Sequence, residues 1–192
     1  MTKVTLAYAT PSEWTETVLA DFDRFLLDHA AAEKKASGMA VSMLSHYPDR
    51  VELVEAMADL AVEEMTHYRE VVKLIHNRGQ LTAKDDKDPY VNQFRKALRN
   101  GAEEYFLDRL LIGGIIEARG AERFGLIAEA LEPGPLKKFY TSITRSEQRH
   151  EGLMVDLALL YFDRAEVMER LQQLIDIEAD IIAALPLRAA LH

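Results

Sequence analysis

The chain has 192 residues, a formal net charge of −9 and no cysteine. A chain of this length can bury one core, so we expect residues 1–192 to form a single domain. The absence of cysteine excludes disulfides, thiolate metal sites and iron–sulfur clusters, so any metal must be held by histidine and carboxylate side chains. The acidic charge argues against general non-specific binding to nucleic acids but leaves room for a local basic patch.

The composition predicts an all-α protein. Alanine, leucine, glutamate, lysine and arginine dominate, and no window shows the alternation of β-branched residues that is typical of strands. Residues 1–10 contain one lysine and no apolar segment of signal-peptide length, and no stretch reaches the roughly eighteen uncharged residues of a membrane span. We therefore expect a cytoplasmic protein that does not associate with membranes.

The first half of the chain predicts two long helical regions. The first begins at Thr10-Pro11-Ser12-Glu13, which reads as a capping box with proline at the first helical position. It is expected to break near Asp21, to resume, and to end at His46-Tyr47-Pro48-Asp49, with Asp49 capping the next helix. The second long helix is predicted from Arg50 to Arg78 and ends at a glycine C-cap signal, Asn77-Arg78-Gly79.

The second half begins with a charged, aperiodic loop from Gln80 to Pro89. Asp163, with Glu166 three residues later, marks the cap of the last helix. The final six residues are expected to fray. The predicted elements are a short helix at 90–99, a third long helix at 103–131, a turn at 132–135, a fourth helix at 136–162 and a fifth ending near Pro186.

Basic residues occur in small clusters beside acidic neighbours. For every cluster we favour a solvated helix face over a substrate-binding patch. The clusters are Lys34-Lys35, Arg95-Lys96-Arg99, Arg119 with Arg123, Lys137-Lys138, and Arg145 with Arg149.

Two predicted helices contain a Glu-x-x-His motif. The motifs are Glu64-Met65-Thr66-His67 and Glu147-Gln148-Arg149-His150. Residues three apart lie on one helical face, so the carboxylate and the imidazole of each motif can reach the same metal. A single tetrapeptide of this kind is weak evidence, because charged helices produce it by chance.

Each motif is preceded by a helix that carries one further glutamate at a matching distance. Glu33 lies 31 residues before Glu64, and Glu117 lies 30 residues before Glu147. The turns at Pro48 and Pro133 fall close to the middle of these intervals, so in antiparallel hairpins the paired glutamates reach similar heights. The spacing predicts that six side chains converge on one layer of a helical bundle.

The neighbours of the four glutamates are apolar or small at helical spacing, as expected where a ligand interrupts a core-facing stripe. Four buried carboxylates would be very unfavourable without cations. Two divalent ions would balance the four negative charges and leave the histidines neutral. Carboxylate and imidazole donors suit iron, with manganese less favoured. The predicted ligands, through which the catalytic chemistry would run, are Glu33, Glu64, His67, Glu117, Glu147 and His150.

Other residues near the motifs allow two interpretations. His29, one turn before Glu33, could support that ligand, but we favour simple partial burial. Glu63 and Glu151 flank the motifs and either orient the ligand imidazoles or are solvated. Gly113-Gly114 either leave space for dioxygen or a substrate, or allow close helix packing.

Four segments resemble the tRNA 2-methylthio-N6-isopentenyladenosine hydroxylase family, and the similarity spans nearly the whole chain. They are residues 26–36, 63–68, 116–124 and 146–150. The resemblance implies a ferritin-like four-helix bundle with a long crossover between its second and third helices and an additional C-terminal helix. It also implies a non-haem di-iron centre, and the six ligands fall on the positions already derived.

The same resemblance implies a monooxygenase that uses dioxygen as co-substrate and an external electron donor or reductase. Its reaction would hydroxylate the isopentenyl side chain of the modified adenosine in tRNA. A tRNA substrate conflicts with the acidic net charge, so we predict a local basic rim and salt-sensitive binding.

Two rival functions remain open at this point. A bacterioferritin-like or rubrerythrin-like protein for iron oxidation or storage keeps both motifs. A quinone hydroxylase would need a membrane-facing apolar helix, which the sequence lacks. The hydroxylase interpretation predicts a small homo-oligomer with about two irons per chain, whereas storage predicts a large hollow shell.

Overall fold

The computed structural model describes residues 2–192, which form helices and connecting segments without a strand. The chain divides into two compact units, which we describe separately. One unit contains the residues up to Thr15, Asp88–Leu187 and His192, and the other contains Glu16–Lys87 and Arg188–Leu191. The helix α1 (Ser12–Ala20) runs from the first unit into the second.

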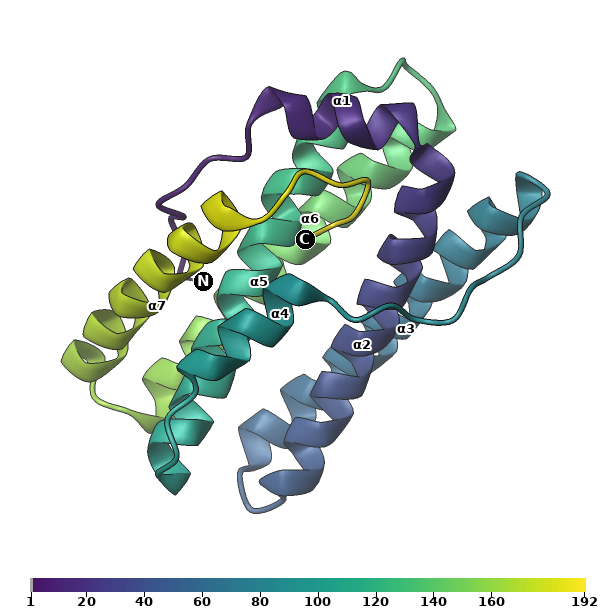
Figure 1. The fold of residues 1–192 in the computed structure, drawn as a ribbon. Helices are drawn as coiled ribbons and strands as arrows, with labels where there is room; N and C mark the ends of the chain where they lie inside the picture. Colours follow the sequence, from purple (N-terminus) through teal and green to yellow (C-terminus); the bar gives the residue numbers. More distant parts are fainter. Residues whose placement is uncertain (1) are drawn as a thin grey trace. The chain divides into compact units, whose positions relative to one another are not determined.

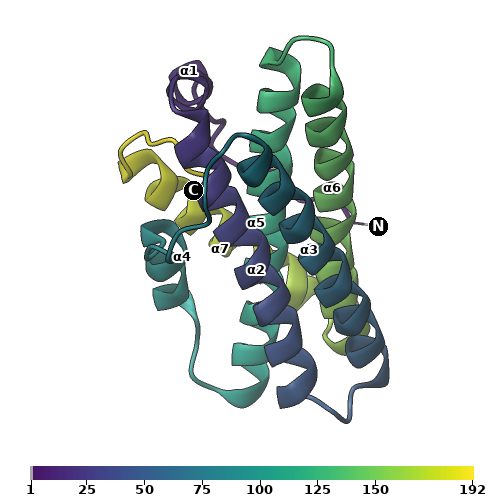
Figure 2. The same cartoon turned by 90° about the vertical axis from the view of Figure 1, so that its right-hand side faces the viewer.

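The unit of residues 16–87 is built on two long helices, α2 (Phe22–His46) and α3 (Val51–Asn77), which lie side by side (Figures 1 and 2). Asp21 separates α1 from α2 and caps α2, because its side chain accepts a hydrogen bond from the amide of Arg24. The prediction that Asp49 caps the next helix is wrong. The N-cap of α3 is Arg50, which makes no side-chain capping bond.

The polar loop that follows α3 begins as the sequence predicts. Gly79 has a positive φ of 73°, and the amide of Gln80 bonds to the carbonyl of Ile75, which closes the helix end. Two lysines of α2 bind the middle of this loop through hydrogen bonds. Lys34 Nζ donates to Asp85 Oδ1 at 2.8 Å, and Lys35 Nζ donates to the carbonyl of Asp86 at 3.0 Å. The cluster Lys34-Lys35 therefore holds a loop in place.

The other unit contains a second long hairpin, formed by α5 (Ala102–Ala130) and α6 (Pro135–Tyr161). The helix α7 (Arg164–Ala184) packs against α5, and α4 (Pro89–Phe94) packs against α7. The turn at 132–135 separates α5 from α6 as predicted, and Asp163 caps α7 by accepting from the amide of Ala165. Part of the predicted short helix is a 3-10 turn at Arg95–Ala97. Figure 1 shows α4, α5, α6 and α7.

The expectation that the last six residues fray is wrong for the last three, which are buried. The His192 ring stacks on Tyr90 with centroids 4.6 Å apart, and its Nδ1 lies 3.2 Å from Asp88 Oδ2. In the other unit, the amide of Leu191 donates to Asp28 Oδ2 at 2.7 Å. Aromatic stacking and a charged acceptor hold these residues, and neither contact is visible in the local sequence.

Gly113 and Gly114 let α5 pack closely against α6. A Cβ atom on Gly114 would lie 3.2 Å from the carbonyl oxygen of Glu151 and 3.2 Å from Met154 Cβ, and one on Gly113 would lie 3.3 Å from Met154 Cε. The room beside the glycines is thus filled by Met154 and the backbone of α6. Of the two interpretations of this pair, close helix packing is the one the structure supports.

Alanine at Gly114 is expected to destabilise the protein by about 1–3 kcal/mol, because the backbone of α6 would have to move. Gly120 on the same helix is a matched control. A Cβ there meets Phe124 Cε2 at 3.8 Å, an ordinary contact, so Gly120→Ala should be neutral or should stabilise by up to about 1 kcal/mol through helix propensity. Urea unfolding of the iron-free variants measures both effects. Equal changes in the two variants would contradict the packing role of Gly114.

Across residues 2–192, none of the helices combines the length and the apolar character needed to cross a membrane.

Candidate metal centre

The hairpin of α2 and α3 gathers three of the predicted ligands. Ligand atoms of Glu33, Glu64 and His67 all lie within 4.8 Å of one another. His67 Nδ1 is 3.5 Å from Glu33 Oε2 and 3.8 Å from Glu64 Oε2. Both carboxylates are buried, with exposed fractions of 4% and 1%. We call these three residues the α2–α3 cluster.

His29 supports this cluster more directly than the sequence suggests. The side chain is fully buried, and its Nε2 lies 2.6 Å from Glu33 Oε1, one helical turn away. Burial lowers the pKa of His29 to about 3, with a further contribution from His67, so the imidazole is neutral at physiological pH. A neutral imidazole can donate its N–H to the carboxylate and fix its orientation. Of the two interpretations, the supporting role fits and partial burial does not.

The hairpin of α5 and α6 gathers the other three predicted ligands. Ligand atoms of Glu117, Glu147 and His150 all lie within 4.8 Å of one another, and His150 Nδ1 is 3.2 Å from Glu147 Oε2. Their exposed fractions are 7%, 3% and 3%. We call these three residues the α5–α6 cluster.

The two glutamates that flank the motifs behave differently from each other. Glu63 is 38% exposed, and its Oε1 is 3.9 Å from His67 Nε2. Glu151 is buried, and burial raises the pKa of its carboxyl group. Glu63 is thus partly solvated and also close to the predicted ligand His67, so it fits both interpretations. The solvated interpretation fails for Glu151.

The donor chemistry of both clusters fits a metal ion. Each cluster offers two carboxylates and one imidazole, the hard oxygen and borderline nitrogen donors that suit iron or manganese. Two buried carboxylates in one place repel each other and are poorly solvated, so a divalent cation at each cluster would balance the charge. Apolar stripes surround the glutamates as predicted, with Leu26 and Ala30 before Glu33 and Leu110 before Glu117 all buried.

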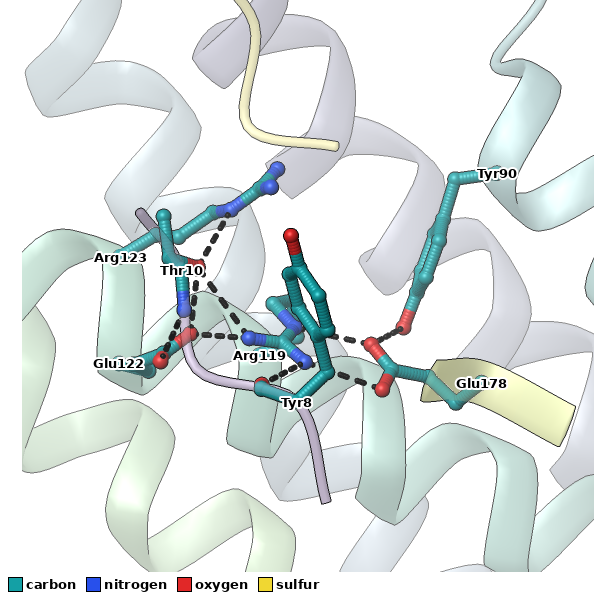
Figure 3. A network of polar contacts seen from close by, with 7 residues as sticks. All are labelled: Tyr8, Thr10, Tyr90, Arg119, Glu122, Arg123 and Glu178. Atoms are coloured by element: carbon teal, nitrogen blue, oxygen red, sulfur yellow. Dashed lines mark hydrogen bonds and ion pairs between the residues drawn. The ribbon is translucent and has the colours of Figure 1, made fainter. Parts of the chain in front are cut away.

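A buried polar network is centred on Arg119 of α5, two residues after Glu117 in the sequence (Figure 3). Arg119 Nε donates to Glu178 Oε1 at 2.8 Å, and the hydroxyl of Tyr90 donates to the same oxygen at 3.1 Å. Arg119 also donates to the carbonyl of Tyr8 and pairs with Glu122. Burial and the charge of Glu178 raise the pKa of Tyr90. The network joins α5, α7, α4 and the N-terminal segment within one unit.

The prediction of a solvated face is wrong for Arg119 and Arg123. Their exposed fractions are 0% and 4%. The guanidinium of Arg123 lies over the Trp14 ring, 4.7 Å from its centroid, and burial lowers the pKa of Arg123 to about 10. The sequence does not show this burial, because Glu178 and Tyr8, which accept from Arg119, and Trp14, which lies against Arg123, are distant along the chain.

Comparisons with known proteins identify the family. The model of the family described as tRNA-(MS[2]IO[6]A)-hydroxylase (MiaE) matches residues 1–192. A tRNA 2-(methylsulfanyl)-N(6)-isopentenyladenosine(37) hydroxylase from Pseudomonas putida is 32% identical over 162 residues, which are 84% of this chain and 78% of that protein. The hydroxylase of the same name from Salmonella typhimurium is 30% identical over 155 residues, which are 81% of this chain but only 56% of that protein.

A solved structure supports the fold. The protein described as "Protein 43 with aldehyde deformylating oxygenase activity from Synechococcus" has a TM-score of 0.90 and 34% sequence identity, and the match covers 96% of this chain and 92% of that one. This likeness confirms the predicted all-α, ferritin-like fold class. The family match and the two relatives confirm the resemblance seen in the motif segments, so the chain is an enzyme that belongs to the tRNA-(MS[2]IO[6]A)-hydroxylase (MiaE) family.

Proposed function

We propose that the chain is a non-haem di-iron monooxygenase that hydroxylates the isopentenyl group of 2-methylthio-N6-isopentenyladenosine in tRNA, with dioxygen as co-substrate. The main support for this proposal is the arrangement of the two ligand clusters. In a chain of the MiaE family, two helix hairpins each hold two buried glutamates and a histidine within 4.8 Å of one another.

The proposed metal ligands are the members of both clusters, and we propose that residues 1–192 form one domain. Iron is favoured over manganese because of the reaction that the family name implies. Bound iron, reduced by an external electron donor, would supply the activation of dioxygen and the transfer of one oxygen atom to a C–H bond. The proposed ligands are Glu33, Glu64, His67, Glu117, Glu147 and His150.

The protein's own contribution is to hold these donors in place and to keep water away from them. His29 would orient Glu33 through the 2.6 Å contact. Close packing at Gly114 and the apolar stripes around the glutamates would keep the surroundings of the metals dry, which strengthens electrostatic interactions at the site. We propose that the enzyme is cytoplasmic and that it forms a small homo-oligomer.

Iron storage is the alternative function, because bacterioferritin-like and rubrerythrin-like proteins use a similar ligand set. Chromatography and metal analysis separate the two. The hydroxylase should elute as a small oligomer with about two irons per chain, whereas a storage protein should elute as a large shell containing hundreds of irons.

The decisive test is the analysis of nucleosides from cellular tRNA. Deletion of the gene is expected to remove the hydroxylated nucleoside and to leave its isopentenyl precursor, because the proposed reaction is the step between them. A plasmid copy of the wild-type gene should restore the product, and a His150→Ala copy should not. Mass spectrometry of digested tRNA measures both nucleosides. Persistence of the hydroxylated nucleoside in the deletion strain would refute the tRNA assignment.

A further inference from the structure

The outer face of α6 carries a row of exposed cationic side chains. Lys138, Arg145 and Arg149 are all exposed and follow one another at intervals of seven and four residues. At about 100° per residue these positions fall on one stripe of the helix, and at about 1.5 Å per residue they span roughly 16 Å. The row lies on the side of α6 opposite to Glu147, the ligand on the same helix.

The acidic neighbours of this row point away from it. Glu147 and Glu151 are 3% and 6% exposed, and between Lys138 and Arg149 the other exposed residues are Ser142 and Gln148, which are neutral. The cations and the carboxylates of this part of α6 alternate in the sequence but lie on different faces of the helix. Among the charged side chains from Lys138 to Glu151, the exposed ones are all cationic.

The charge of this face contrasts with the charges of α3 and α7. α3 contains six carboxylates and two cationic side chains, and α7 contains five carboxylates and two cationic side chains. In a chain with a net charge of −9, the outer face of α6 is thus a local basic surface. Such a surface attracts a polyanion even when the whole protein is acidic.

The stripe lacks apolar anchors. Among residues 2–192, the large exposed apolar side chains lie outside the segment from Lys138 to Arg149. A membrane-binding helix would present apolar residues beside its cations, whereas a phosphate backbone requires only cations and hydrogen-bond donors. The chemistry of the stripe therefore favours a nucleic-acid backbone.

We infer that Lys138, Arg145 and Arg149 on the outer face of α6 bind phosphate groups of the RNA substrate. This inference rests on the proposed function, which supplies a tRNA substrate. Because the stripe is opposite to Glu147 on a helix about 10 Å wide, it contacts phosphates that flank the reacting nucleotide and not that nucleotide itself. These contacts fix the position of the RNA but do not recognise its base sequence.

The test is a salt titration of tRNA binding to the iron-loaded protein. Lys138→Gln/Arg145→Gln removes two cations from the stripe, while Arg149 is kept because it donates to the Arg145 carbonyl and to Ser146 Oγ, next to Glu147. The slope of log K against log salt should become shallower by about 1.4, and affinity at 0.1 M salt should fall about twentyfold. The probe is tRNA that carries the isopentenyl nucleoside.

Arg95→Gln/Lys96→Gln is the matched control, since it also removes one arginine and one lysine, both exposed, from the same unit. It should change affinity less than twofold. Lys138→Arg/Arg145→Lys keeps the charges and should bind as wild type, which separates charge from folding. Equal effects of the two Gln variants, or none from Lys138→Gln/Arg145→Gln, would overturn the inference while leaving the proposed function standing.

Two other outcomes are also informative. Wild-type protein that binds no tRNA at any salt concentration would refute the inference together with the tRNA substrate. Binding to anionic lipid vesicles that depends on Lys138 and Arg145, without such dependence for tRNA, would assign the stripe to a membrane and overturn the inference.

Discussion

Alanine in place of Glu117 is expected to abolish tight binding of two irons and to reduce tRNA hydroxylation below about one hundredth of the wild-type rate. Loss of a residue that only supports a metal ligand already lowers metal affinity or activity by about 10–100-fold, so loss of a ligand should lower them at least as much. Glu117 is 7% exposed, and its ligand atom lies within 4.8 Å of those of Glu147 and His150. Its loss leaves this cluster with one carboxylate and one imidazole. Elemental analysis after iron loading and desalting measures the effect.

Glu129→Ala is the control for this experiment, because Glu129 lies on the same helix and its side chain is exposed. It should retain about two irons per chain and wild-type activity. Circular dichroism should show that both variants are helical, so that a loss of metal is not a loss of fold. An unchanged iron content in the Glu117→Ala variant would remove the basis of the di-iron proposal.

The helices and the ligand candidates could be predicted from sequence because both depend on local spacing. Glu-x-x-His places two donors on one helical face, and the turns at Pro48 and Pro133 fold each pair of helices back on itself. The same regularity explains why helix ends were predicted to within one or two residues. A periodic pattern between strong turn signals leaves few alternatives.

Two features that were predicted wrongly, the solvated Arg119 and the fraying C-terminus, depend on partners far along the chain. Arg119 is buried because Glu178, 59 residues later, receives its guanidinium, and His192 is held by Tyr90 and Asp88. Likewise, Arg145 and Glu147 are neighbours in sequence but face opposite ways on α6. Tertiary packing decides whether a charged side chain is buried, and the residue pattern of a single helix does not reveal that packing.

Glu178→Ala is expected to lower the free energy of unfolding by about 3–5 kcal/mol, because it leaves the buried Arg119 charge without its main counterion. Glu178 Oε1 accepts from Arg119 Nε at 2.8 Å and from Tyr90 at 3.1 Å, and Oε2 accepts from Arg119 at 3.0 Å (Figure 3). All three side chains have an exposed fraction of 0%. Urea unfolding of the iron-free protein measures the change.

Two further variants test whether the charge of Glu178 is the cause. Glu178→Gln keeps an acceptor for Arg119 but removes the negative charge, so its loss of stability should be smaller than that of alanine yet still measurable. Asp180→Ala removes an exposed carboxylate two residues later on α7 and should change stability by no more than about 0.5 kcal/mol. If Glu178→Ala unfolded at the same urea concentration as Asp180→Ala, the buried ion pair would add nothing to stability.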